Sequence, residues 1–140
     1  MTVDLVESDR EGRVIKSFIE LKAQSNKSDN PLSAMCEVVM YYSLFKKVRE
    51  RAQEIGFKLP RDLADRGFSL VVLAPKRYYN YFHSNNEKND KLLKRISTEM
   101  TKSLNIKCQY RKIGIDCHAS KGADMCLENI AVAYRAKPIK

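Results

Sequence analysis

The feature that most constrains the fold is an apolar run at residues 14–23 that carries a charged pair near its end. Glu20 and Lys22 are the charged residues, and Leu21 separates them. Successive side chains of an extended strand point to opposite faces, so Glu20 and Lys22 share one face while Leu21 points to the other. The run therefore predicts a largely buried β-strand that places a carboxylate and an ammonium group side by side.

A second acidic residue, Asp4, stands in the shorter apolar stretch 3–6, and turn-forming residues 9–13 separate the two stretches. A hairpin of strands at about 2–7 and 14–23 would bring Asp4 near Glu20. Two carboxylates and a lysine at one sheet edge can bind a hard divalent cation and activate a water molecule. The alternative is an exposed strand end with an ordinary ion pair.

The rest of the chain predicts an α/β fold with the element order β-β-α-β-α-β-β. Asn30 followed by Pro31 predicts the start of a helix that runs to about Ile55. Its expected buried stripe consists of Leu32, Met35, Cys36, Val39, Met40 and Leu44. The apolar run 68–74 predicts a central strand. The other expected elements are a loop at 58–67, a short helix at 77–83, a helix at 90–104, a strand at 106–115, a loop at 116–124 and a strand at 129–136.

Composition favours a single domain over residues 1–140 with a polyanionic partner. Lysine and arginine outnumber aspartate and glutamate by 26 to 17, which gives a net charge of +9. A soluble domain with a lysine-rich surface is the plainer alternative. No stretch is apolar enough to span a bilayer, so we expect a cytoplasmic protein whose cysteines are free thiols. The cysteines are Cys36, Cys108, Cys117 and Cys126, and they lack the close pairs that zinc sites use.

The order of Asp4, a hairpin, Glu20-Leu21-Lys22, a helix and an apolar strand resembles the PD-(D/E)xK nuclease superfamily. The resemblance covers residues 3 to about 75. It implies a restriction-endonuclease-like fold, a three-layer core with a central mixed β-sheet flanked by helices. The superfamily has a helix and a strand before the Asp, and the three residues before Asp4 do not supply them.

The resemblance also implies roles for the residues that match the motif. Asp4 and Glu20 would bind Mg²⁺ or Mn²⁺ together with the backbone oxygen of Leu21, and Lys22 would orient the attacking water. Asp4, Glu20 and Lys22 are thus the candidate catalytic residues. On the next helix, Glu37 and Tyr41 resemble a Gln/Glu-x-x-x-Tyr signature and would support the site; a solvated Glu37 and a half-buried Tyr41 are the alternative.

Charged and aromatic residues alternate after the central strand, at Lys76, Arg77, Tyr78 and Tyr79. Such a segment suits contacts with a nucleic-acid backbone and stacking on bases. The alternative is an amphipathic helix whose aromatic rings pack in the core.

Three functions remain open from the sequence. The first is a metal-dependent nuclease, or nuclease domain, that hydrolyses the phosphodiester bonds of DNA. The second is an inactive domain of the same fold that binds nucleic acid or a protein partner, and the third is a small RNA-binding module. Because the opening hairpin needs cover, we expect the helix at 90–104 or a second copy in a homodimer to lie over it, unless the chain belongs to a longer parent protein.

Overall fold

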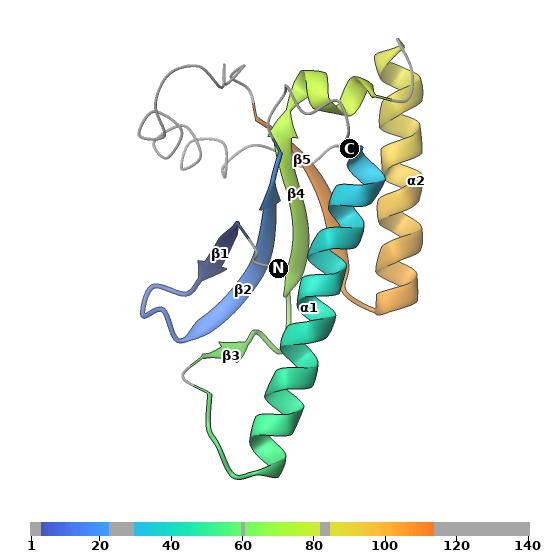
Figure 1. The fold of residues 1–140 in the computed structure, drawn as a ribbon. Helices are drawn as coiled ribbons and strands as arrows, with labels where there is room; N and C mark the ends of the chain where they lie inside the picture. Colours follow the sequence, from blue (N-terminus) through green and yellow to red (C-terminus); the bar gives the residue numbers. More distant parts are fainter. Residues whose placement is uncertain (1–3, 23–29, 60, 82–84, 114–140) are drawn as a thin grey trace.

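The computed structural model of the chain describes residues 4–22, 30–59, 61–81 and 85–113, which form an α/β fold with a mixed, open β-sheet flanked by helices (Figure 1). The elements in chain order are β1 (Leu5–Ser8), β2 (Val14–Leu21), α1 (Pro31–Glu54), β3 (Asp62–Leu63), β4 (Ser69–Pro75), the 3-10 helix η1 (Lys76–Asn80), α2 (Asn86–Leu104) and β5 (Lys107–Ile113). The sheet has the order β1-β2-β4-β5, and β3 pairs with the start of β2. β1 is antiparallel to β2, whereas β2, β4 and β5 are parallel.

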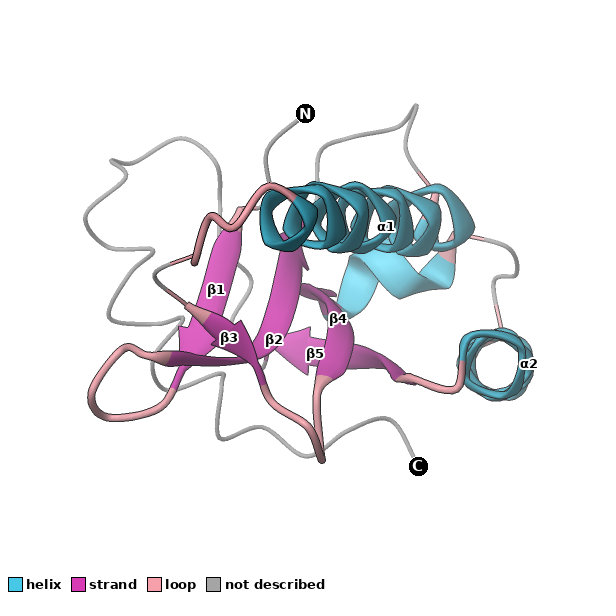
Figure 2. Ribbon diagram, turned by 90° about the horizontal axis from the view of Figure 1, so that it is seen from below, coloured by secondary structure: helices cyan, strands magenta, loops and turns pink. Residues whose placement is uncertain are grey.

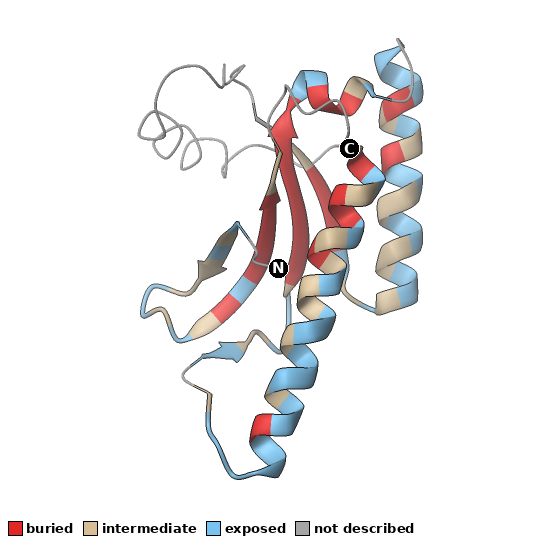
Figure 3. Cartoon of the chain, viewed as in Figure 1, coloured by how far each residue is buried: buried red, intermediate tan, exposed pale blue. Residues whose placement is uncertain are grey.

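The core lies on both sides of β4, the central strand that the apolar run predicted. Every residue of β4 is buried, and β2 and β5 flank it in the sheet (Figure 3). On one face, Phe18 of β2 and Tyr110 of β5 join side chains of α1 and α2 in the larger apolar cluster. Figure 2 shows α1 over one face of the sheet. The smaller cluster, on the other face, contains Ile19, Val71 and Leu73.

Helix α1 begins as its sequence predicts. The side chain of Asn30 accepts a hydrogen bond of 2.9 Å from the backbone N–H of Ser33, and Pro31 occupies the first turn. The helix ends at Glu54, and Gly56 follows with a φ of 74°, a conformation that costs glycine little.

The predicted buried stripe of α1 is partly wrong. Met35 is fully buried, but Leu32, Met40 and Leu44 are between 44% and 55% exposed. The residues of α1 that are buried are Pro31, Ala34, Met35, Val38 and Ala52. A helix of 24 residues is about 36 Å long, whereas a strand of eight residues spans about 26 Å, so the second half of α1 extends beyond the sheet (Figure 1).

Several other boundaries differ from the sequence prediction. The expected loop at 58–67 contains the two-residue strand β3. Helix α2 starts four residues earlier than expected, because Asn85 caps it by accepting hydrogen bonds from the backbone N–H groups of Glu87 and Lys88. The expected strand at 129–136 and the loop at 116–124 lie outside the described residues.

The expectation that the helix at 90–104 covers the opening hairpin is wrong. Helix α2 packs against β5, which is separated from β1 by β2 and β4 in the sheet order. The short connection from α2 to β5 holds the helix beside the strand that directly follows it, at the opposite edge of the sheet from the hairpin.

Candidate functional site

A cluster of charged side chains lies at the C-terminal end of β2. The ammonium nitrogen Nζ of Lys22 is 2.9 Å from Oε1 of Glu20 and 2.6 Å from Oε2 of Glu37. The side chains of Glu20 and Lys22 are each only 11% exposed, and that of Glu37 is 45% exposed. One nearly buried ammonium group is therefore held between carboxylates from a strand and a helix.

The path of the chain explains why Glu37 reaches Lys22. The connection from β2 to the parallel strand β4 passes through α1, which packs against both strands. Right-handed crossovers of this kind return the chain along a helix antiparallel to the strands, so the first turns of α1 lie near the end of β2. Glu37 is in the second of these turns.

Tyr41 lies one turn beyond Glu37 and makes a different contact. Its ring packs edge-on against Phe18 with a centroid distance of 4.9 Å, and it belongs to the partly buried rim of the core. The structure therefore brings Glu37 to Lys22 and places Tyr41 against the apolar core. The sequence analysis expected Glu37 to support the site but did not identify Lys22 as its partner; the crossover from β2 through α1 to β4 explains this contact.

Asp4 approaches the cluster from the neighbouring strand. Leu5 is opposite Ile19 in the antiparallel pair, so Asp4 precedes β1 at the level of Glu20. Oδ2 of Asp4 accepts a hydrogen bond of 2.9 Å from the backbone N–H of Leu21. The N–H and C=O groups of a strand residue point to the same neighbouring strand, so the carbonyl oxygen of Leu21 also faces the Asp4 side.

The cluster shifts the pKa values of its two coupled carboxyl groups in opposite directions. Burial raises the pKa of Glu20 from 4.5 to about 7, and the negative charge of Asp4 and a hydrogen bond with Glu37 add to this, while Lys22 opposes it. The hydrogen bond from Lys22 is the main reason why the pKa of Glu37 is lowered from 4.5. Glu20 therefore keeps its proton to a higher pH than Glu37 does.

The donor atoms near Asp4 can be compared with the needs of a divalent cation. Among the described residues, no group of three or more His, Cys, Asp or Glu side chains is arranged to bind a metal ion. Magnesium in proteins is often held by only one or two carboxylates, with waters and substrate oxygens completing six ligands. Asp4, Glu20 and the carbonyl oxygen of Leu21 are hard oxygen donors, the kind of ligand that such a partly hydrated ion uses.

The segment after β4 only partly matches its predicted role. Lys76 and Arg77 are exposed in η1, at the end of the central strand. Tyr78 and Tyr79 are 5% and 0% exposed and belong to the larger core cluster, so their predicted stacking on bases is wrong for this conformation. η1 runs from the end of β4 towards the start of α2 (Figure 1), and both rings pack in the core cluster.

The hydroxyl group of Tyr79 forms hydrogen bonds with the backbone of β4 and β5. It lies 2.8 Å from the carbonyl oxygen of Val72 and 3.0 Å from that of Arg111, so it donates its hydrogen bond between β4 and β5. Burial raises the pKa of Tyr79 well above 10. This tyrosine therefore ties η1 to two strands.

Within the described ranges, Cys36 and Cys108 are free thiols, the first exposed and the second buried. Cys117 and Cys126 lie outside the described residues. Neither α1, α2 nor any other helix in the described part of the chain has the apolar length that crossing a membrane requires. Compared with protein-family models, with curated proteins and with solved structures, the chain matches none.

Proposed function

We propose that the chain is a metal-dependent nuclease of the restriction-endonuclease-like fold that hydrolyses phosphodiester bonds of DNA, using Mg²⁺ or Mn²⁺. The observation that carries the proposal is the contact of Lys22 with Glu20 at the end of β2, beside Asp4, which directly precedes the neighbouring strand β1. The element order from β1 through β2 and α1 to the parallel strand β4 is the order that the sequence resemblance implies. A three-layer core is part of the same proposal.

Each residue of the cluster has a chemical role in this proposal. Asp4, Glu20 and the Leu21 carbonyl oxygen would hold the metal ion, which supplies Lewis-acid polarisation of a phosphoryl oxygen. Lys22 places a positive charge beside that position and can stabilise the charge that develops on the phosphate. Glu37 orients Lys22 through the 2.6 Å contact.

A near-neutral pKa suits Glu20 to this reaction. A carboxyl group with a pKa of about 7 exchanges its proton at the pH at which an enzyme works, whereas an ordinary glutamate is always ionised there. Binding of a cation beside Glu20 would favour the ionised form, so metal binding and proton release are coupled. Lys76 and Arg77, exposed at the end of β4, would contact the nucleic-acid backbone.

A second candidate function is an inactive domain of the same fold that binds nucleic acid or a protein. The observation that favours it is that Lys22 is already paired with two carboxylates. Such a closed cluster can be an internal ion pair with a purely structural role. In that case the basic surface alone would carry the function.

Cleavage of labelled DNA distinguishes the two functions. Single-stranded and duplex DNA are incubated with the protein in the presence of magnesium, manganese or a chelator, and the products are separated by length. We expect metal-stimulated cleavage that is lost on Glu20→Gln, a change that keeps the shape of the side chain and removes its charge.

Glu11→Gln is the matched control, because Glu11 lies in the turn of the same hairpin and its side chain is 67% exposed. This control should cleave like the unmodified protein. Equal cleavage by the Glu20→Gln variant would contradict a nuclease site at this cluster. No cleavage by the unmodified protein with either metal would contradict the nuclease proposal and favour the inactive domain.

A further inference from the structure

A groove of about 400 Å³ lies between α2 and β5, at the opposite edge of the sheet from the charged cluster. Its polar lining includes Lys94, Ser97, Thr98, Thr101, Lys102 and Lys107. No carboxylate lines the groove among the described residues. The hydroxyl group of Thr98 already donates to the carbonyl oxygen of Lys94 at 2.8 Å. Three ammonium groups and the hydroxyl groups of Ser97 and Thr101 make this a surface for an anion that accepts hydrogen bonds.

The lysines lie on both walls of the groove. Lys94 and Lys102 are eight residues apart on α2, and Lys107 begins β5 across from them. Lys94 and Lys107 are exposed and form no ion pair within the described part of the chain. Lys102 contacts Glu99 at 3.4 Å, with both side chains more than 60% exposed, so this pair is weak.

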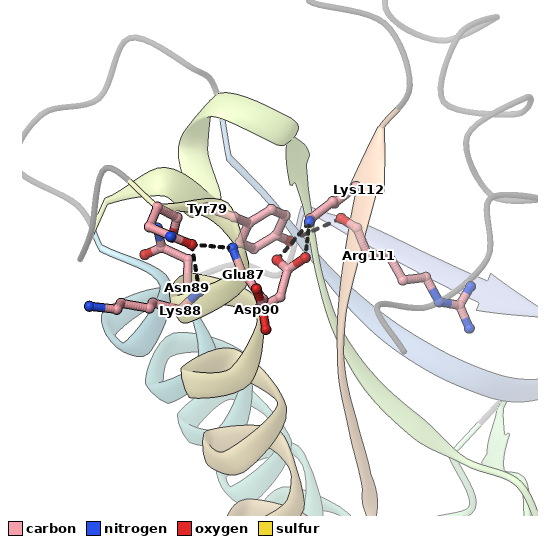
Figure 4. Close-up of polar contacts among 8 residues, drawn as sticks. Tyr79, Glu87, Lys88, Asn89, Asp90, Arg111 and Lys112 are labelled. Carbon is pink, nitrogen blue, oxygen red and sulfur yellow. Dashed lines mark hydrogen bonds and ion pairs between the residues drawn. The ribbon is translucent and has the colours of Figure 1, made fainter.

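The two walls are fixed to each other. Thr101 accepts a hydrogen bond of 3.0 Å from the backbone N–H of Cys108 at one end of the groove. One helical turn before Lys94, Oδ1 and Oδ2 of Asp90 lie 2.7 and 2.9 Å from Nζ of Lys112 (Figure 4). Figure 4 shows this pair joining the start of α2 to β5. Lys112 also neutralises Asp90, the acidic residue that would otherwise repel an anion entering along this side of α2.

We propose that this groove binds the phosphodiester backbone of the nucleic acid whose cleavage is proposed above, and the inference rests on that function. Lysines contact phosphates as point charges, and hydroxyl groups donate hydrogen bonds to phosphate oxygens. The groove thus contributes affinity and positions the strand, whereas the cluster at β2 performs the chemistry.

The sheet register gives the separation of the two sites. Lys112 is opposite Ala74, the residue after Leu73, which is itself opposite Leu21. The end of β2 is two strand spacings from β5, about 10 Å, and Cys108 lies four residues before Lys112, about 13 Å along the strand. The backbones of the two sites are therefore about 16 Å apart, so a bound strand must extend several nucleotides beyond the groove to reach the cluster.

The test measures binding without cleavage. Fluorescence anisotropy of a labelled single-stranded DNA of twelve nucleotides is recorded in a chelator, over a series of salt concentrations. The double variant Lys94→Gln/Lys107→Gln is compared with Lys47→Gln/Lys58→Gln, which removes two exposed lysines from α1 and the segment after it. Both double variants lower the net charge from +9 to +7, because each removes two lysines.

We expect the groove variant to bind about tenfold more weakly and the control to change less than twofold. Two lost phosphate contacts should also lower the slope of log K against log salt concentration by about 1.4. The same measurement is repeated with shorter DNAs. The affinity of the unmodified protein should rise in a step between lengths of four and eight nucleotides, and the groove variant should lack this step. Lys94→Arg/Lys107→Arg should retain binding, and thermal unfolding checks that each variant folds.

Equal losses in the groove variant and the control would overturn the inference, because only net charge would then matter. Displacement of the DNA by inorganic phosphate, at a concentration equal to that of the phosphate groups in the DNA, would also overturn the inference. It would indicate a site for small anions. Selective binding in the groove without any cleavage in magnesium would refute the nuclease and leave the groove intact. Cleavage that is lost on Glu20→Gln, with no selective groove effect, would refute the groove alone.

Discussion

Replacing Glu20 by glutamine should change how the stability of the protein depends on pH. The pKa of this group is about 7 in the folded protein and 4.5 when unperturbed. Because the folded state binds the proton more tightly, Glu20 contributes stability that is complete below pH 4.5 and is lost as the pH rises through 7. The Glu20→Gln variant cannot lose this proton, so its stability should not follow that decline.

The size of the effect follows from linkage. A pKa difference between 4.5 and about 7 corresponds to a limit of about 3 kcal/mol. Between pH 5 and pH 8 the unmodified protein should therefore lose about 2 kcal/mol of its free energy of unfolding relative to the variant. Glu37 does not contribute in this window, because its lowered pKa moves its effect below pH 4.5.

Urea denaturation followed by circular dichroism at pH 5, 6, 7 and 8 measures this difference. Other titrating groups are common to both proteins, so they cancel in the comparison. Glu11→Gln, at an exposed position in the hairpin turn, should give a curve parallel to that of the unmodified protein. Parallel curves for Glu20→Gln as well would show that Glu20 ionises as in water and would refute the reasoning about the cluster.

Three further measurements test other parts of the structure. Millimolar magnesium should raise the melting temperature of the unmodified protein more than that of Glu20→Gln, because only the folded site binds the ion; equal shifts would argue against a metal at this position. Tyr79→Phe should lower the free energy of unfolding by about 1–3 kcal/mol in urea denaturation, since it removes the buried hydrogen bond from Tyr79 to the strand carbonyl groups; a change below about 0.5 kcal/mol would mean that this bond contributes little. Asn30→Ala should cost about 1 kcal/mol by removing the cap of α1, and an unchanged stability would mean that the Ser33 N–H is satisfied by water.

Local signals in the sequence predicted those parts of the fold that depend on neighbouring residues. The apolar run of β4 required burial on both faces, and Asn30 with Pro31 marked the start of α1 from two adjacent residues. The side-by-side placement of Glu20 and Lys22 followed from the period of a strand, and the 2.9 Å contact between their side chains agrees with it.

Tertiary packing determined the features that the sequence reasoning missed. Met40 and Leu44 fit a helical stripe, but the sheet contacts the side of α1 that carries Ala34 and Val38, so the predicted stripe lies on the flank. Tyr79 could equally have faced solvent or core, because a turn of 3-10 helix has no amphipathic pattern long enough to decide.

The energetics of the cluster bear on why such residues stand at the end of β2. Removing an ammonium and a carboxylate from water costs more than many ion pairs return, and apolar residues of similar size often stabilise a protein as well or better. The side chains of Lys22 and Glu20 are each 11% exposed, so most of this desolvation cost applies to them. The same desolvation is the main reason why the pKa of Glu20 is raised. A buried pair with perturbed protonation is an inefficient way to hold a strand in place but a useful one for moving protons and binding cations. This imbalance favours a chemical role for the cluster over a purely structural one.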